Sequence, residues 1–258
     1  MPTASLIYYY AYQSGEVESL PVILIHGAGG NHLNWPPQIR RIPGYRIYAP
    51  DLPGHGKSGG RGHQNVLTYA QSLIEWVDAL SINRAAFVGH SMGGAIAQTL
   101  AAYYPNRVAA LGLISTGARL GVDPFILENA ASPTTLHKAV ETLMDRFFGS
   151  PMDQSILKQI EASMYAIRQS VISGDFQACN TFDMLDRLGA ITCPTVVICG
   201  AEDKLTPVRY AQYLANEIPD ARLEIIPEAG HMVMLEKPDE VVGVIKGFLD
   251  SVPYQAGD

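Results

Sequence analysis

The sequence predicts an α/β fold, in which a mostly parallel central sheet carries helices on both faces. Two observations lead to this prediction. Short apolar runs, typical of strands buried on both faces, alternate with helix-like segments through the first 115 residues and return after residue 194. Between these regions, residues 121–187 show amphipathic helical patterns but no convincing strand run. We therefore expect a core made of residues 1–120 and 188–258, with a helical cap inserted at 121–187.

The elements of the core follow one another in a regular order. Strands are expected at 6–12, 22–27, 45–51, 85–90, 110–116, 195–200 and 222–227. Helices, recognised by apolar residues three or four positions apart, are expected in the core at 68–80, 92–104, 208–217 and 238–249. The cap is expected to contain three helices, at 134–148, 152–173 and 176–188.

The charge balance and the cysteines exclude several classes of protein. The chain has 18 basic and 25 acidic side chains and a formal net charge of −7, whereas nucleic-acid and anionic-membrane surfaces need basic patches. No apolar run reaches 18 residues, and the N-terminus has no signal-peptide pattern, so we expect no membrane span. Cys179, Cys193 and Cys199 are odd in number and lack metal-ligand spacing. They predict buried thiols in a reducing cytoplasm, with no metal or other cofactor.

A glycine-flanked serine follows the strand at 85–90. Residues 89–93 read G-H-S-M-G, a G-x-S-x-G pattern between a strand and a helix. In that context the turn is so sharp that Ser91 takes strained dihedral angles, and Gly89 and Gly93 remove the resulting clashes. The Ser91 hydroxyl is then lifted to the carboxyl end of the sheet beside a helix N-terminus, where negative charge is favoured. Ser91 is therefore the predicted nucleophile.

A serine nucleophile needs a base, and His231 is the predicted one. It lies on a glycine-containing loop directly after the last strand, on the same edge of the sheet as Ser91. Of the other six histidines, His90 adjoins Ser91 and should point away from its hydroxyl, and His26 adjoins another strand end. His55 is expected to pack in a turn, His32 and His63 to lie in surface loops, and His137 on a solvated face of the cap.

The acid that orients the base should lie between Ser91 and His231 in the chain. Asp203 follows the strand at 195–200 by three residues and is favoured. Asp123 is the alternative, but a longer loop separates it from its strand. Glu202 has no role in this chemistry and is expected to be a solvated charge. Thr206 and Pro207 are expected to cap and begin the next helix.

Two backbone N–H groups are expected to hold the oxyanion. One belongs to Met92, directly after the nucleophile, and the other to the glycine-rich loop at 26–30. In that loop Ala28 is favoured and Gly29 is the alternative. The loop lacks both the G-x-G-x-x-G and the Walker lysine patterns, which argues against a phosphate site.

Together these motifs resemble the α/β-hydrolase superfamily, in particular its esterases with a helical cap. The matching segments are HGAGG (26–30), DLPGHGKS (51–58), GHSMGG (89–94), GAEDKLTP (200–207) and AGHMVMLEKP (229–238). They follow the family's order over nearly the whole chain. One departure is at the N-terminus, where a single β run precedes the strand at 22–27 instead of the usual two. The resemblance therefore predicts a sheet that lacks one edge strand.

The resemblance implies a serine carboxylesterase that acts on a small-molecule ester. An acyltransferase, a lactonase or a C–C bond hydrolase would use the same three side chains, and a non-enzymatic ligand receptor could retain them. Family C–C hydrolases tend to carry Asn before the serine, where this chain has His90. The expected substrate-binding residues are Gly29, Phe147, Met164 and Tyr165. The oligomeric state is left open.

Overall fold

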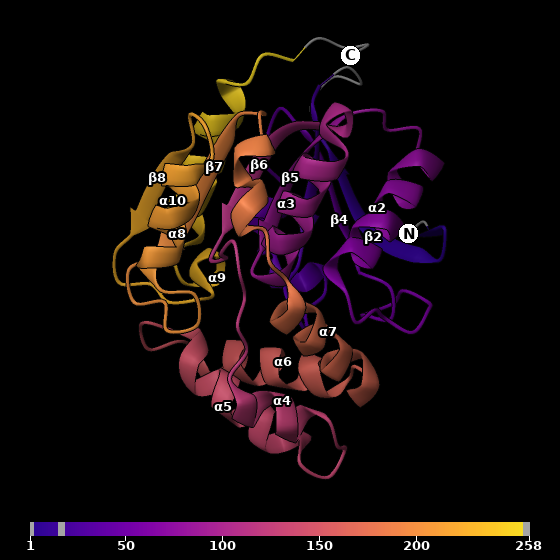
Figure 1. Cartoon of the computed structure of the whole chain (residues 1–258), viewed down its shortest axis with the longest axis vertical. Coiled ribbons are helices and arrows are strands. Elements are labelled where there is room, and N and C mark those ends of the chain that lie inside the picture. Colours follow the sequence, from indigo (N-terminus) through magenta and orange to yellow (C-terminus); the bar gives the residue numbers. More distant parts are fainter. Residues whose placement is uncertain (1–2, 15–18, 255–258) are drawn as a thin grey trace.

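The computed structural model describes residues 3–14 and 19–254, so residues 1–2, 15–18 and 255–258 of the predicted core lie outside the described part. Within this part an eight-stranded sheet has the order β1-β2-β4-β3-β5-β6-β7-β8 (Figure 1). The predicted fold class and strand positions are confirmed. The strands are β1 (Thr3–Ala4), β2 (Ile7–Gln13), β3 (Pro21–Ile25), β4 (Arg46–Pro50), β5 (Ala85–His90), β6 (Val108–Ile114), β7 (Thr195–Gly200) and β8 (Arg222–Ile226).

The strands from β3 to β8 run parallel, whereas β2 pairs antiparallel with β4. The prediction of a missing edge strand was wrong, because a two-residue β1 pairs antiparallel with β2. Ser5 and Leu6, both with positive φ, form the turn between these strands. A run of two residues is too short to give a period-2 pattern, so the sequence did not reveal it.

The helices of the core cover both faces of the sheet (Figure 1). One apolar cluster joins the sheet to the short α1 (Pro37–Arg40) and to α10 (Pro238–Asp250). A second cluster joins the opposite face to α2 (Val66–Ala79), α3 (Met92–Tyr103) and α8 (Val208–Glu217). The remaining short elements are α9 (Val233–Glu236) and the 3-10 helices η1 (His32–Asn34), η2 (Pro105–Arg107) and η3 (Leu185–Ala190).

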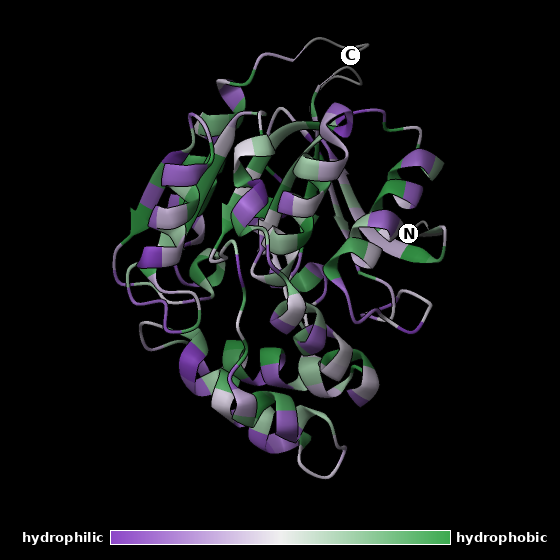
Figure 2. Ribbon diagram, in the orientation of Figure 1, coloured by the Kyte–Doolittle hydropathy of each residue, from purple (hydrophilic) through white to green (hydrophobic). Residues whose placement is uncertain are grey.

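In Figure 2 the strands are coloured mainly as hydrophobic residues, whereas α8, at the front of the view, carries several hydrophilic ones. This distribution is what a sheet buried on both faces requires. Among the described residues, no helix has the length and apolar character needed to cross a membrane.

Four helices between β6 and β7 lie over one end of the sheet, and we refer to them as the cap helices (Figure 1). They differ from the three helices expected there. The helix predicted at 152–173 is broken at Ile167, whose buried side chain packs inward, and Arg168, which donates a hydrogen bond to the Gly60 carbonyl. A short first helix, capped by Asp123 and begun by Pro124, was missed. The cap helices are α4 (Pro124–Ala130), α5 (Leu136–Phe147), α6 (Gln154–Tyr165) and α7 (Gln169–Thr181).

Candidate active site

Ser91 occupies the turn between β5 and α3. Its φ of 52° and ψ of −118° are strained for a residue with a side chain. The turn exists because its flanks are glycine: a Cβ on Gly89 would collide with the carbonyl of Gly93, and a Cβ on Gly93 with that of Ile25. The Ser91 N–H donates to the Ile114 carbonyl at 2.9 Å, which ties the turn to β6.

His231 and Asp203 meet at the carboxyl ends of β8 and β7. The His231 Nδ1 lies 3.0 Å and 3.1 Å from the two carboxylate oxygens of Asp203, and both side chains are buried. With Nδ1–H donated to Asp203, Nε2 is left to exchange a proton with another group. Ser91 and His231 line the same cavity. No described hydrogen bond joins them, as is common for catalytic pairs before substrate binds.

Asp203 is held as a carboxylate by several donors. The N–H groups of Leu205 and Thr206 donate to Oδ1 at 2.9 Å and 2.8 Å. The Thr206 hydroxyl donates to Oδ2 at 2.8 Å and lies 3.2 Å from His231 Nδ1. Burial alone would raise the pKa of Asp203, but the charge and hydrogen bond of His231, with those of Thr206, lower it to about 2.

Thr206 therefore has a different role from the one expected. Its hydroxyl belongs to the Asp203–His231 pair, and Pro207 occupies the position before α8 without a side-chain cap. Asp123, the alternative acid, instead pairs with Arg146 at 2.9 Å and caps α4. Glu202 is exposed, as expected.

His90 supports the backbone of the predicted base. Its Nε2–H donates to the His231 carbonyl at 2.9 Å. Burial, followed by the neighbouring His231, lowers the pKa of His90 to about 3, so the ring stays neutral. The expectation that His32 lies on the surface was wrong. It is buried, with Nδ1 2.7 Å from Asp51, because that carboxylate needs a buried partner.

The glycine-rich loop distinguishes the two candidate oxyanion donors. The Gly29 N–H donates to Asp175 Oδ2 at 2.8 Å, so this amide is already occupied. The Ala28 N–H has no partner among the described hydrogen bonds, and Met92, as the first residue of α3, has no intrahelical acceptor for its own. Both Ala28 and Ser91 line the cavity. This geometry favours Ala28 over Gly29.

Asp175 itself was not identified from the sequence. It projects from α7 of the cap and is fully buried. Its carboxylate accepts hydrogen bonds from Tyr69 at 2.6 Å and from His55 Nε2 at 2.7 Å, in addition to Gly29. Burial alone would lower the pKa of His55, but Asp175 raises it overall. His55, expected to pack in a turn, thus also bridges the core to the cap.

A second contact between cap and core surrounds the loop that carries His231. The Glu236 carboxylate accepts the N–H groups of Gly149 and Gly230, both at 2.8 Å, and of Ser150 at 3.2 Å. The two glycines touch so closely that a Cβ on Gly149 would lie 2.6 Å from the Gly230 nitrogen. Nearby, the Phe147 ring stacks on His231 at 6.1 Å between centroids.

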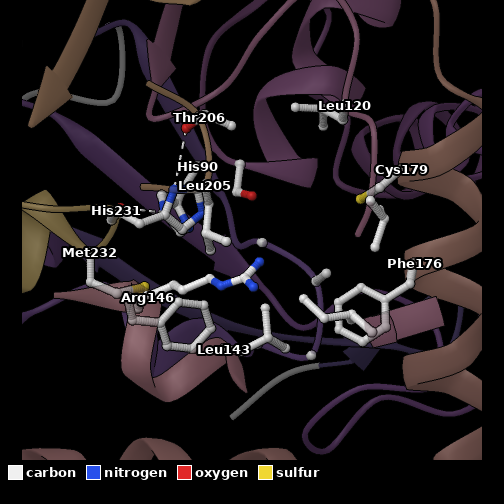
Figure 3. A pocket seen from close by; sticks show the side chains of 18 of the residues that line it. His90, Leu120, Leu143, Arg146, Phe176, Cys179, Leu205, Thr206, His231 and Met232 are labelled. Carbon is white, nitrogen blue, oxygen red and sulfur yellow. Dashed lines mark hydrogen bonds between the residues drawn. The ribbon is translucent and has the colours of Figure 1, made fainter. Parts of the chain in front are cut away.

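The cavity between cap and core has a volume of about 210 Å³ (Figure 3). Of the predicted substrate-binding residues, Gly29, Phe147 and Met164 line it. Tyr165, at the end of α6, is 43% exposed and does not line it. Sequence reasoning missed Arg146, Cys179 and Tyr210, which also line the cavity. In the part of the chain that is described, no group of three or more His, Cys, Asp or Glu side chains is placed to hold a metal ion.

Comparisons with known proteins agree with this architecture. Residues 21–238 match the model of the α/β hydrolase fold family, so the chain belongs to that family. A 2-hydroxy-6-oxo-6-phenylhexa-2,4-dienoate hydrolase of Burkholderia cepacia is 30% identical over 84% of this chain and 83% of its own length. A thermophilic esterase of known structure is 33% identical, with a TM-score of 0.81 over 95% of this chain and 98% of that one.

A further relative is longer than this chain. The dihydrolipoyllysine-residue acetyltransferase component of the acetoin cleaving system of Pseudomonas putida is 31% identical over 92% of this chain. The chain spans 65% of the length of that relative. Relatives of this family thus include hydrolases and an acyltransferase component.

Proposed function

We propose that this protein is a serine hydrolase that cleaves small carboxylic esters through an acyl-enzyme. The Ser91 oxygen attacks the ester carbonyl while His231 Nε2 takes its proton, and the alcohol leaves with that proton. Water then attacks the acyl-enzyme, giving a proton to His231, and the serine is restored as the acid leaves. Asp203 orients the imidazole and stabilises its charged form, and the N–H groups of Ala28 and Met92 stabilise the oxyanion.

One observation carries this proposal. A buried Asp203–His231 pair opens on the same cavity as a serine held in a strained strand-to-helix turn. A strained serine is costly to maintain, and such strain is concentrated at functional sites. The similarity to an esterase of known structure supports the same reaction class.

Hydrolysis of neutral p-nitrophenyl esters of increasing acyl length tests the proposal. We expect Ser91→Ala, which removes the nucleophile, and Asp203→Asn, which leaves His231 without the acid that orients it, each to lower kcat by about 10⁴-fold or more. Glu202→Gln is the matched control, since this exposed carboxylate stands beside Asp203 without contacting His231, and its kcat should stay near wild type. Equal rates for Ser91→Ala and wild type would refute the esterase proposal.

Hydrolysis of a C–C bond beside a carbonyl is the second candidate. It is favoured by the 30% identity to the dienoate hydrolase. The same three side chains would serve, because water again has to be activated against a carbonyl. Comparing kcat/KM for simple esters with that for a 2-hydroxy-6-oxo-dienoate separates the two activities.

A further inference from the structure

Three charged side chains line the cavity without a role in the proposed chemistry. They are Arg146 at the end of α5, Lys204 in the loop after β7, and Asp123 before α4. Two cations and one carboxylate give this wall one excess positive charge, in a chain whose formal net charge is −7. Much of the remaining wall is apolar, with Leu143 and Phe176 among its members. A cation in such surroundings is best stabilised by an anion.

Arg146 is held on one side only. Its Nη1 donates to Asp123 Oδ2 at 2.9 Å, while Asp123 Oδ1 accepts the Phe125 N–H and so stays fixed at the start of α4. Among the described contacts, the Nε and Nη2 of Arg146 have no protein acceptor. A guanidinium carries five N–H donors in a rigid plane, so the tether to Asp123 orients the group and leaves donors for a ligand.

The position of Arg146 is fixed relative to the predicted base. The next residue, Phe147, stacks on His231 with an angle of 13° between the rings, and its carbonyl accepts the Met232 N–H at 3.0 Å. The end of α5 is thereby attached to the loop that carries His231. In Figure 3 the guanidinium of Arg146 reaches into the space between His231 and Phe176.

We propose that Arg146 binds a carboxylate of the substrate, and that the preferred substrates are esters bearing a second, free carboxylate. This inference rests on the proposed function of the same cavity. Asp123 holds the guanidinium in place, and the substrate carboxylate accepts the N–H groups that Asp123 leaves unused. Lys204, which is exposed in the loop after β7, adds a second positive charge without a described hydrogen bond. Planar carboxylate recognition is the task for which arginine is better suited than lysine.

A pair of substrates with nearly equal shape tests the proposal. Monomethyl adipate ends in a carboxylate, whereas methyl 6-methylheptanoate ends in an isopropyl group of similar shape. We expect wild type to favour the anionic ester in kcat/KM by about 10–100-fold, the contribution of charge-assisted hydrogen bonds. Arg146→Gln should bring the ratio of kcat/KM for the anionic ester to that for the neutral ester to about 1, while Arg146→Lys should retain part of the preference.

Lys204→Gln is the matched control, because it removes another positive charge from the wall of the same cavity. We expect it to reduce the preference by less than about 3-fold, as an exposed charge is screened by solvent. The proposal is overturned if wild type shows no preference, if Arg146→Gln lowers both substrates equally, or if Lys204→Gln matches the loss of Arg146→Gln.

Calorimetric binding of monomethyl adipate to the Ser91→Ala variant separates this proposal from the esterase proposal. We expect Arg146→Gln, added to Ser91→Ala, to weaken binding about 10-fold or more. If wild type cleaves no ester but this Arg146-dependent binding is present, the esterase proposal fails and the carboxylate site stands. Binding that is absent, or that does not change with Arg146, refutes the carboxylate site.

Discussion

The cap helices meet the core at two junctions, each built on one carboxylate that accepts at least one backbone N–H group, yet the two differ in which loop they hold. At the first junction, Asp175 of the cap is fully buried and accepts a hydrogen bond from the Gly29 N–H in the glycine-rich loop. At the second junction, Glu236 of the core is half-buried and accepts hydrogen bonds from the N–H groups of Gly149, in the cap, and Gly230, beside His231. One junction thus fixes the loop proposed to hold the oxyanion, and the other the loop of the proposed base.

The partners of the two carboxylates also differ. Asp175 has two side-chain partners, Tyr69 and His55, besides its one amide. Glu236 accepts backbone amides, and its burial raises its pKa. A fully buried charge is costly to leave without partners, whereas a half-buried one can turn to water. The same kind of hydrogen bond should therefore have unequal effects at the two junctions.

The largest effect is expected from Asp175→Asn. Removing the buried charge leaves His55, Tyr69 and Gly29 with poorer acceptors, at a cost of about 3 kcal/mol in the free energy of unfolding. Because a single oxyanion donor contributes about 10²–10³ in kcat, a displaced loop should lower kcat by at least about 10-fold with little change in KM. Steady-state kinetics and urea unfolding of the variant measure both quantities. A variant that unfolds more easily but keeps wild-type kcat would show that Asp175 only supports the fold.

Glu236→Gln should have a smaller effect on stability. Glutamine can accept from only one side, so about 1–2 kcal/mol is expected, the contribution of hydrogen bonds to a partly exposed charge. Because the loosened loop carries His231, Glu236→Gln should change the shape of the plot of kcat/KM against pH. Asp175→Asn should instead lower kcat/KM by the same factor at every pH. If the plots of kcat/KM against pH had the same shape for both variants, the two junctions would not differ in which part of the proposed chemistry they support.

Tyr69→Phe removes one hydrogen bond from the Asp175 junction and leaves the carboxylate its other partners. We expect a loss of about 1.5 kcal/mol in the free energy of unfolding and a change in kcat below about 3-fold. Thermal unfolding together with ester kinetics tests this. A kcat loss as large as that of Asp175→Asn would indicate that the tyrosine, and not the carboxylate, positions the loop.

The smallest effect is a pH dependence of stability at the same junction. The pKa of His55 is raised in the folded protein, so its charged form adds stability that is complete below the unfolded value of about 6.5 and is lost as pH rises through the folded value. We therefore expect the wild-type unfolding temperature to fall on the alkaline side more steeply than that of His55→Gln. Parallel curves for the two proteins at every pH above about 6.5 would contradict this.

The core could be predicted because its signals are local. Apolar runs marked the parallel strands, and a five-residue pattern, with glycines on either side of Ser91, marked the turn between β5 and α3. The sequence could place Asp203 and His231 at the same edge of the sheet because each follows a strand end by a few residues. In a parallel sheet, chain position relative to a strand end gives position in space.

The cap and its junctions could not be predicted in the same way. Asp175 contacts Gly29 across 146 residues of chain and His55 across 120. In the sequence of an amphipathic helix, a buried aspartate of this kind looks the same as an aspartate exposed to solvent. The break before α7 follows from how Arg168 and Ile167 contact the core, which no periodicity encodes. Thr206 looked like a helix cap because threonine is a favoured N-cap residue and proline is favoured at the first position of a helix.

The contact between Gly149 and Gly230 has a consequence for protein engineering. Neither position has space for a side chain, since the cap and the loop of His231 meet there backbone to backbone. A designer who replaces the cap to change substrate range would need to keep glycine at both positions and graft the new helices on either side of them. Any set of variants with a redesigned cap should therefore keep Gly149 and Gly230 unchanged.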